Sequence, residues 1–234
     1  MTPTPIEIRP KPYDFDDDLI DFVKKTGKPK MRIYRPVEKS IVLGRGSQIE
    51  KEIDVEHCTN DDIDLRRRAG GGCAVVLDPG NVIVSIALPV TGLGKNDVYI
   101  RMLSDWIISA LHRLGFKGVE QNGVSDIVWN DKKIGGSCVY RTRNVLYYSV
   151  SLLVSADLPM LERYLKHPPR EPGYRRGRRH SDFVINLSEH PAFTSLEHFA
   201  LGLGMVLGYP EIEPQTAVAP VQDQSNAITV ARYR

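Results

Sequence analysis

Cysteine is scarce in this chain. The three cysteines, Cys58, Cys73 and Cys138, are an odd number and show no CxxC spacing, which argues against a disulfide framework and a zinc site. Long apolar runs are also missing. No segment approaches the roughly eighteen apolar residues that span a bilayer, and the proline-broken, acidic N-terminus lacks the apolar stretch of a secretion signal. These absences favour a reducing compartment, the cytoplasm, and no membrane partner.

A large excess of charge of either sign is lacking too. The 234 residues include 31 Lys and Arg against 29 Asp and Glu, a formal net charge of +2, so the total does not favour binding to nucleic acid or an anionic membrane. Hydrophobic residues at 41% and charged residues at 26% are ordinary for a globular protein, and a chain of this length buries a substantial core. Composition therefore predicts a globular domain with no nucleic-acid partner.

The segment that says most about function is RRRAGGG, residues 66–72. Each glycine in a helix or strand costs roughly 0.5 to 1 kcal/mol, so three in a row need a reason, and the usual reason is close approach of the backbone to a ligand. Arginine forks that stay charged suit a phosphate or carboxylate. An anionic ligand is one interpretation, and a glycine-rich turn beside a solvated basic patch fits these seven residues equally well.

The hydrophobic pattern predicts strands and helices within one domain, residues 15–234, after an extended arm over residues 1–14. Residues 73–78 and 81–89 are expected to pair as a hairpin around a Pro79-Gly80 turn. Further strands are expected at 31–36, 40–46, on either side of the Asn130-Asp131 turn, along LYYSVSLLVS and in AITVARY near the C-terminus. Helices are expected at 19–25, 96–114 and 159–165, and up to Leu207 after a capping box of Thr194 and Glu197.

Four short motifs occur in this chain in the order in which a known enzyme family carries them. RRRAGGG at a strand entrance, LDPGN after it, SDIVW followed by KKIGGS, and a late VINL resemble the lipoate-protein ligase and octanoyltransferase family, which shares its fold with biotin ligases. The resemblance runs from about Arg32 to Leu207. It implies an α+β fold with mixed, largely antiparallel sheets covered by helices, similar to the catalytic domain of class II aminoacyl-tRNA synthetases. It is closest to compact ligases without a C-terminal accessory domain.

The resemblance implies an ATP-dependent enzyme that activates lipoate or octanoate as the acyl-adenylate. The acyl group is then attached through an amide to a lysine of a lipoyl domain or lipoate-binding protein. ATP and Mg²⁺ are the implied cofactors. Activation is needed because a carboxylate is a poor electrophile. Lys133, the lysine of the KI-G-S motif, is expected to polarise the acyl carbonyl and to stabilise developing negative charge.

The other site residues follow from the same resemblance. Arg67 and Arg68, with the backbone of Gly70, Gly71 and Gly72, are expected to hold acyl and phosphate oxygens.

Asp126 is expected to bind the magnesium nucleotide, since a carboxylate suits Mg²⁺. Gly135 and Gly136 either let the chain pass close to ligand or accommodate a bulge. Ser137 donates to phosphate or to its own turn. Asn186 binds the acyl or nucleotide side, or satisfies backbone groups.

Departures from the family pattern keep alternatives open. Ser125 and Ser149 stand where many relatives have an asparagine and a histidine. Too little chain follows Leu207 for an accessory domain, which implies a separate accessory polypeptide, a ligase that works without one, or a different enzyme. The alternative is an octanoyltransferase that takes octanoyl from acyl carrier protein through a Cys138 thioester, activated by nearby Lys133. A packed Cys138 is the simpler interpretation. A catalytically idle acyl-binding relative is the third.

A basic loop spans residues 167–181. It is expected to cover the nucleotide as a lid or to dock an acidic lipoyl domain or carrier protein, and a solvated loop is the remaining interpretation. Aromatic residues for stacking single-stranded RNA are sparse in it. The residues concerned are Arg175, Arg176, Arg178, Arg179 and His180.

Overall fold

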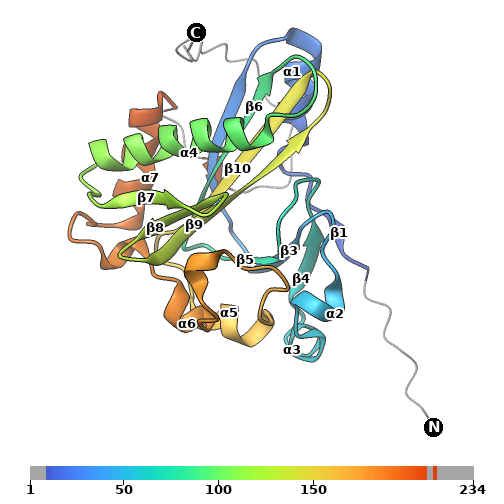
Figure 1. Cartoon of the computed structure of the whole chain (residues 1–234), viewed down its shortest axis with the longest axis vertical. Helices are drawn as coiled ribbons and strands as arrows, with labels where there is room; N and C mark the ends of the chain where they lie inside the picture. The colour runs from blue at the N-terminus through green and yellow to red at the C-terminus, as the bar shows by residue number, and fades with distance from the viewer. Residues whose placement is uncertain (1–8, 210–212, 215–234) are drawn as a thin grey trace.

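Two β-sheets face each other in the computed structural model, which describes residues 9–209 and 213–214 (Figure 1). The larger sheet has seven strands in the order β11-β2-β6-β10-β9-β8-β7, and the smaller has four in the order β1-β4-β3-β5. The larger comprises β2 Lys30–Arg35, β6 Asn81–Pro89, β7 Val119–Asn122, β8 Asp126–Trp129, β9 Lys132–Arg141, β10 Val145–Leu153 and β11 Glu213–Pro214. The smaller comprises β1 Lys11–Pro12, β3 Ser40–Leu43, β4 Asp64–Arg67 and β5 Val75–Leu77.

Helices pack around both sheets. The α-helices are α1 Asp17–Thr26, α2 Ile49–Glu52, α3 Val55–Asn60, α4 Asn96–Arg113, α5 Pro159–Tyr164, α6 His180–Phe183 and α7 Leu196–Leu207. Short 3₁₀ turns lie at Gly173–Arg175 and Leu187–Glu189. Pairing is antiparallel throughout the larger sheet except between β11 and β2, and mixed in the smaller one. The predicted α+β fold with mixed, largely antiparallel sheets is confirmed.

The main core lies between the larger sheet and helices α4 and α7 (Figure 1). Helix α4 forms because its apolar residues recur at helical spacing, and it ends before Gly115, whose φ of 93° is left-handed. Strand β10 contributes Tyr148, Val150 and Leu152 to this core, all fully buried. Because side chains alternate along a strand, Tyr147, Ser149 and Ser151 point to the opposite face, toward the smaller sheet.

The expected hairpin between residues 73–78 and 81–89 is wrong. Strand β5 pairs with β3, and β6 lies between β2 and β10 in the other sheet. The chain turns a corner between the sheets, where Asp78 Oδ1 accepts from Gly80 N at 2.6 Å and Asn81 Oδ1 accepts from Asp78 N at 2.8 Å. A Cβ on Gly80 would overlap the Ser155 carbonyl oxygen. The apolar strand β6 therefore gains two partners in the buried middle of the larger sheet.

Strands β2 and β3, predicted at 31–36 and 40–46, likewise enter different sheets. The predicted helices α1, α4 and α5 are present, and so are strands β8, β9 and β10. The turn between β8 and β9 uses Asn130 and Asp131 at φ of 52° and 57°, as a two-residue hairpin turn requires. The expected strand AITVARY lies outside the described residues. Within the described residues, no helix has the length and apolarity to cross a membrane.

Helix α7 is capped by Ser195 and not by the predicted Thr194. The Ser195 side chain accepts a hydrogen bond from His198 N at 3.1 Å, in the geometry of an N-cap. We expect Ser195→Ala to lower the free energy of unfolding by about 1 kcal/mol, because that N–H loses its partner. Thr194→Ala is the matched control and should leave it nearly unchanged. Urea unfolding of both variants measures the difference, and equal losses would contradict this assignment of the cap.

Candidate functional site

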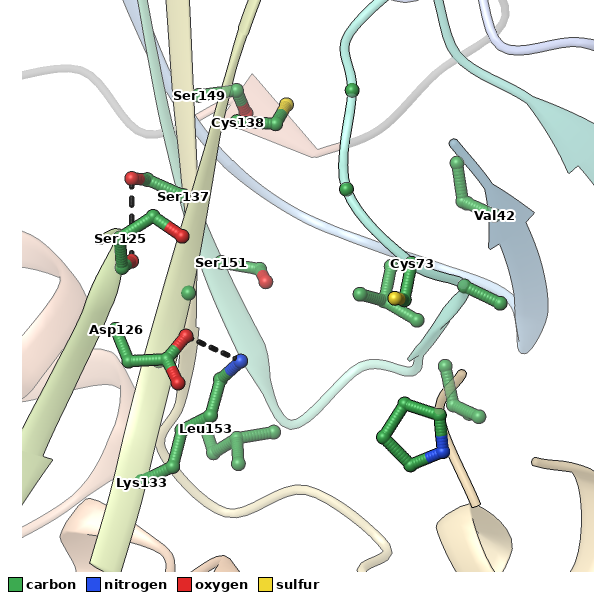
Figure 2. Close-up of a pocket in the computed structure, with 18 of the residues that line it drawn as sticks. Val42, Cys73, Ser125, Asp126, Lys133, Ser137, Cys138, Ser149, Ser151 and Leu153 are labelled. Carbon is green, nitrogen blue, oxygen red and sulfur yellow. Dashed lines mark hydrogen bonds and ion pairs between the residues drawn. The ribbon is translucent and has the colours of Figure 1, made fainter. Parts of the chain in front are cut away.

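A cavity of about 580 Å³ lies between the two sheets, within the size range of small-molecule sites. One wall comes from the glycine loop and strand β5, the other from strands β9 and β10, and residues of the segment 168–184 close one end. Figure 2 shows Lys133 and Asp126 at one end of the drawn region, and Ser149 with Cys138 at the other. The side chains that line the cavity therefore differ in chemistry between these two places.

The first end is built around an ion pair between strands β9 and β8. Lys133 Nζ lies 2.7 Å from Asp126 Oδ1, and Tyr174 OH donates to Asp126 Oδ2 at 2.9 Å. A register shift between Ile127 and Val128 lets the two strands place these side chains together. A Cβ on Gly136 would lie 2.8 Å from Lys133 Nζ. The glycine thus leaves the space into which Lys133 folds.

A second cation lines the same cavity. Arg175 is only 4% exposed, its Nε donates to Arg178 O at 2.9 Å, and its guanidinium stacks on Phe183 at 4.7 Å. Among the described residues, Arg175 Nη2 is buried without a hydrogen-bond partner. The carboxylate of Glu171 lies 3.6 Å from Nε. Because buried donors are rarely left unpaired, an anion is the natural partner for Nη2.

His180, beside Arg175, adds no charge at neutral pH. Burial, with the charge of Arg175 as the next cause, lowers the pKa of the His180 imidazole to about 4. Burial also lowers the pKa of the Arg175 guanidinium, which stays protonated because an arginine pKa is far above neutrality. The positive charge at this end thus comes from Lys133 and Arg175.

The arginines of RRRAGGG bind the protein's own backbone. Arg67 Nη1 donates to Gly44 O at 2.8 Å and Ser47 O at 3.0 Å, and Arg67 does not line the cavity. Arg68 lines it, but its Nη2 donates to Gly71 O at 2.7 Å and Cys73 O at 2.8 Å, and its Nη1 to Val42 O at 2.8 Å. These bonds hold the glycine loop against the smaller sheet.

The glycine loop presents its backbone to the cavity at Gly71 and Gly72, the latter with φ of 92°. Gly70 instead packs on Cys138, since a Cβ there would lie 2.8 Å from Sγ. Burial raises the pKa of the Cys138 thiol, and the nearby Arg68 opposes this only in part. A reactive cysteine needs the opposite shift, toward thiolate.

The model of the lipoyl protein ligase A/B catalytic domain matches residues 11–200. The chain belongs to this family. It is 28% identical over 163 residues to the lipoate-protein ligase A subunit 1 of Thermoplasma acidophilum, covering 66% of this chain and 62% of that protein. Overall, the chain spans about half the length of the curated relatives it matches.

Two solved structures share the fold. One is the bi-partite lipoate protein ligase of Thermoplasma acidophilum, described with its E2 lipoyl domain, at a TM-score of 0.67, 22% identity and coverage of 88% of this chain and 82% of that chain. The other is a lipoate-protein ligase A bound with ATP, at a TM-score of 0.67, 23% identity and coverage of 86% of this chain and 81% of that chain. At these identities, the likeness establishes a lipoate-protein ligase fold.

Two further residues of the family motifs, Asn186 and Ser137, form hydrogen bonds with the backbone of the domain. Asn186 accepts from Ala156 N at 3.0 Å and donates to Ala156 O at 2.9 Å, and it does not line the cavity. Ser137 lines the cavity, with its N–H donating to Ser125 O at 2.9 Å. Of the two interpretations of Asn186, its contacts match the backbone one.

The basic loop of the family domain folds back over the Lys133 end of the cavity. Arg178 Nη2 donates to Tyr174 O at 2.8 Å and lies 3.2 Å from Asp131, while Arg179 is largely exposed, 3.6 Å from Glu162. Arg176 is exposed, at a left-handed φ of 52°. The loop therefore directs Arg175 inward and leaves Arg176 and Arg179 on the surface.

Sequence reasoning missed several residues that the fold brings to the cavity. Tyr174 stands in a polar loop with no pattern around it, yet it donates to Asp126. Tyr13, Tyr147 and Ser151 line the cavity without having been predicted. A signal for Tyr147 and Ser151 was present, because LYYSVSLL alternates polar and apolar residues with the period of a strand. Tyr13 had no local signal.

The buried, neutral His180 makes stability depend on pH. Its pKa is about 4 in the folded protein against about 6.5 in an unfolded chain, so its stabilising contribution is complete above pH 6.5 and is lost as pH falls toward 4. We expect His180→Gln to flatten the fall in unfolding free energy over this window by up to about 3 kcal/mol. The control is His198→Gln, at an exposed position on α7. Parallel pH curves for wild type and His180→Gln, from urea unfolding, would contradict the assignment.

Proposed function

We propose that this chain activates lipoate or octanoate with ATP as the acyl-adenylate and transfers the acyl group to a lysine of a lipoyl-carrying protein. The observation that carries this proposal is one cavity that both Lys133 and Arg175 line, with a buried guanidinium nitrogen of Arg175 lacking a partner. A substrate with an anionic head and a long tail fits such a cavity. Family membership and the ATP-bound neighbour support the choice of an acyl-adenylate.

The first step joins acid and nucleotide. A carboxylate oxygen of the acyl substrate attacks the α-phosphorus of ATP, a P–O bond forms, and pyrophosphate leaves with the electron pair of the broken bond. Arg175 Nη2 donates a hydrogen bond to the phosphate oxygens, since charge-assisted hydrogen bonds are about twice as strong as neutral ones. The backbone of Gly71 and Gly72 gives the ligand close approach on the opposite wall.

The second step transfers the acyl group. The ε-amine of the acceptor lysine attacks the acyl carbonyl carbon, an amide forms, the bond to AMP breaks, and the amine loses a proton. Lys133 binds the carbonyl oxygen as it gains negative charge. In the free protein Asp126 holds Lys133 in this position at 2.7 Å. Arg67 and Arg68 act in this proposal by positioning the glycine loop.

Magnesium enters with the nucleotide. The described residues hold no group of three or more His, Cys, Asp or Glu side chains able to bind a metal alone. Asp126 supplies a single carboxylate at this end, which suits an ion that is held mainly by substrate phosphates and water. Its bound Mg²⁺ would neutralise phosphate charge.

A lipoyl domain is the proposed acceptor, and a second polypeptide is a proposed partner. The Thermoplasma acidophilum neighbour is described as bi-partite and with its E2 lipoyl domain. Arg176 and Arg179 are exposed on the loop over the cavity and would attract an acidic acceptor surface. We also propose a cytoplasmic location, where thiols stay reduced, for a chain whose three cysteines are free.

Lys133→Ala should slow lipoylation by on the order of a hundredfold, because charge stabilisation in the transition state is lost. Lys132→Ala is the matched control: Lys132 neighbours it on β9 and does not line the cavity. Arg175→Met should weaken ATP use, while Arg113→Met, at an exposed position on α4 away from the cavity, should not. The assay follows the mass of a lipoyl domain incubated with lipoate and MgATP, with and without an accessory polypeptide.

Two results would contradict the ligase proposal. One is equal transfer by wild type and Lys133→Ala. The other is modification from octanoyl carrier protein alone that is lost in Cys138→Ser, which would support an octanoyltransferase. The raised pKa and the burial of Cys138 against Gly70 favour the ligase.

A further inference from the structure

The end of the cavity away from Lys133 is lined by hydrogen-bonding groups. Ser149 on β10 pairs directly with Cys138 on β9, and both line the cavity with Tyr147 (Figure 2). The next row toward Lys133 is the pair of Ser151 with Gly136. Two residues along a strand span about 7 Å, so Ser149 and Cys138 lie beyond the head group, alongside the tail of a bound acyl chain.

A buried carboxylate holds these groups in place from behind. Asp16 Oδ2 accepts from Tyr147 OH at 2.6 Å and lies 2.7 Å from Ser85 Oγ, and the Ser85 hydroxyl donates to Ser149 Oγ at 3.0 Å, which leaves the Ser149 proton for a ligand. Tyr34 OH also donates to Asp16, at 3.2 Å. Asp16 is 4% exposed, and its burial raises its pKa. The network ties the cavity end to α1 and fixes the position of Ser149.

Polar groups at this place need a reason. On the other face of the same strand, Tyr148, Val150 and Leu152 are fully buried in the apolar core. Burying hydroxyls and a carboxylate is costly unless every group is bonded, and a pocket for a plain methylene tail needs only apolar walls. Of the three side chains that line this end, Tyr147 already donates to Asp16, which leaves Ser149 and Cys138 beside the tail.

Resting on the proposed function, we propose that Ser149 and Cys138 recognise sulfur at the tail of the acyl chain and so favour lipoate over octanoate. Divalent sulfur is polarisable and is a weak hydrogen-bond acceptor. The Ser149 hydroxyl is an ordinary hydrogen-bond donor and the Cys138 thiol a weak one, and a terminal methyl group accepts from neither. Ser85, Asp16 and Tyr147 act through Ser149 as positioning residues.

The state of Cys138 is compatible with a disulfide-bearing tail beside it. A thiolate would attack a disulfide sulfur, forming a mixed disulfide and expelling the other sulfur as a thiolate. Burial keeps Cys138 as the thiol by raising its pKa, and the nearby Asp16 acts in the same direction. The side chain therefore contacts the tail without trapping it.

Calorimetric titration of the full chain with lipoate and with octanoate, without ATP, tests this directly. Wild type should bind lipoate at least about tenfold more tightly than octanoate, a typical discrimination for a change this small. Ser149→Ala should reduce that ratio about fivefold or more, chiefly by weakening lipoate. Cys138→Ala, a second variant that removes only the thiol, should shift the ratio in the same direction.

The matched control is Ser104→Ala. Ser104 is a buried serine on α4 whose hydroxyl lies 3.2 Å from Tyr148 OH, on the opposite face of β10 from the cavity. It should leave the ratio unchanged. The inference would be overturned if wild type bound the two acids equally or bound neither. It would also be overturned if the ratio of lipoate to octanoate affinity stayed unchanged in both Ser149→Ala and Cys138→Ala, or changed equally in Ser104→Ala. If the protein binds lipoate preferentially but does not ligate it, only the proposed function is contradicted. If it ligates the acyl group but binds lipoate and octanoate equally, only this inference is contradicted.

Discussion

Strand β10 presents its side chains alternately to two faces of the larger sheet, and the rest of the structure depends on that alternation. Tyr148, Val150 and Leu152 join the core under α4 and α7, whereas Tyr147, Ser149 and Ser151 line the cavity. A shift of one residue in register would exchange the two sets. The apolar core therefore both stabilises the fold and sets which side chains meet a ligand.

Charge at the site is divided between residues that build it and residues that face the ligand. Arg67 and Arg68 spend their donors on backbone carbonyls and thereby hold the glycine loop in place. Lys133 and Arg175 line the cavity without binding that loop. The difference is one of partners: a guanidinium with bonded carbonyls has few donors left for an anion, while Arg175 keeps one buried nitrogen unpaired.

Local patterns predicted the elements that are stabilised by their own periodicity. Helix α4 follows from its apolar repeat, and β8, β9 and β10 follow from short alternating segments around an Asn130-Asp131 turn. The predicted hairpin of 73–78 with 81–89 was wrong, because strands distant in the sequence also compete to pair with each of these segments. Nothing in those residues shows that β3 and β10 offer better partners.

Taken alone, the sequence determined the fold class and the family, and it indicated Lys133 and Asp126 as separate site residues, because motifs and periodicity are local properties. Only the tertiary structure decided that Arg68 binds carbonyls, that Arg175 is the buried arginine of its loop, and that Asp16 anchors the far end of the cavity. The physical reason is distance along the chain. Asp16 meets Ser85 and Tyr147 across 69 and 131 residues, and such contacts are set by packing rather than by any neighbouring residue.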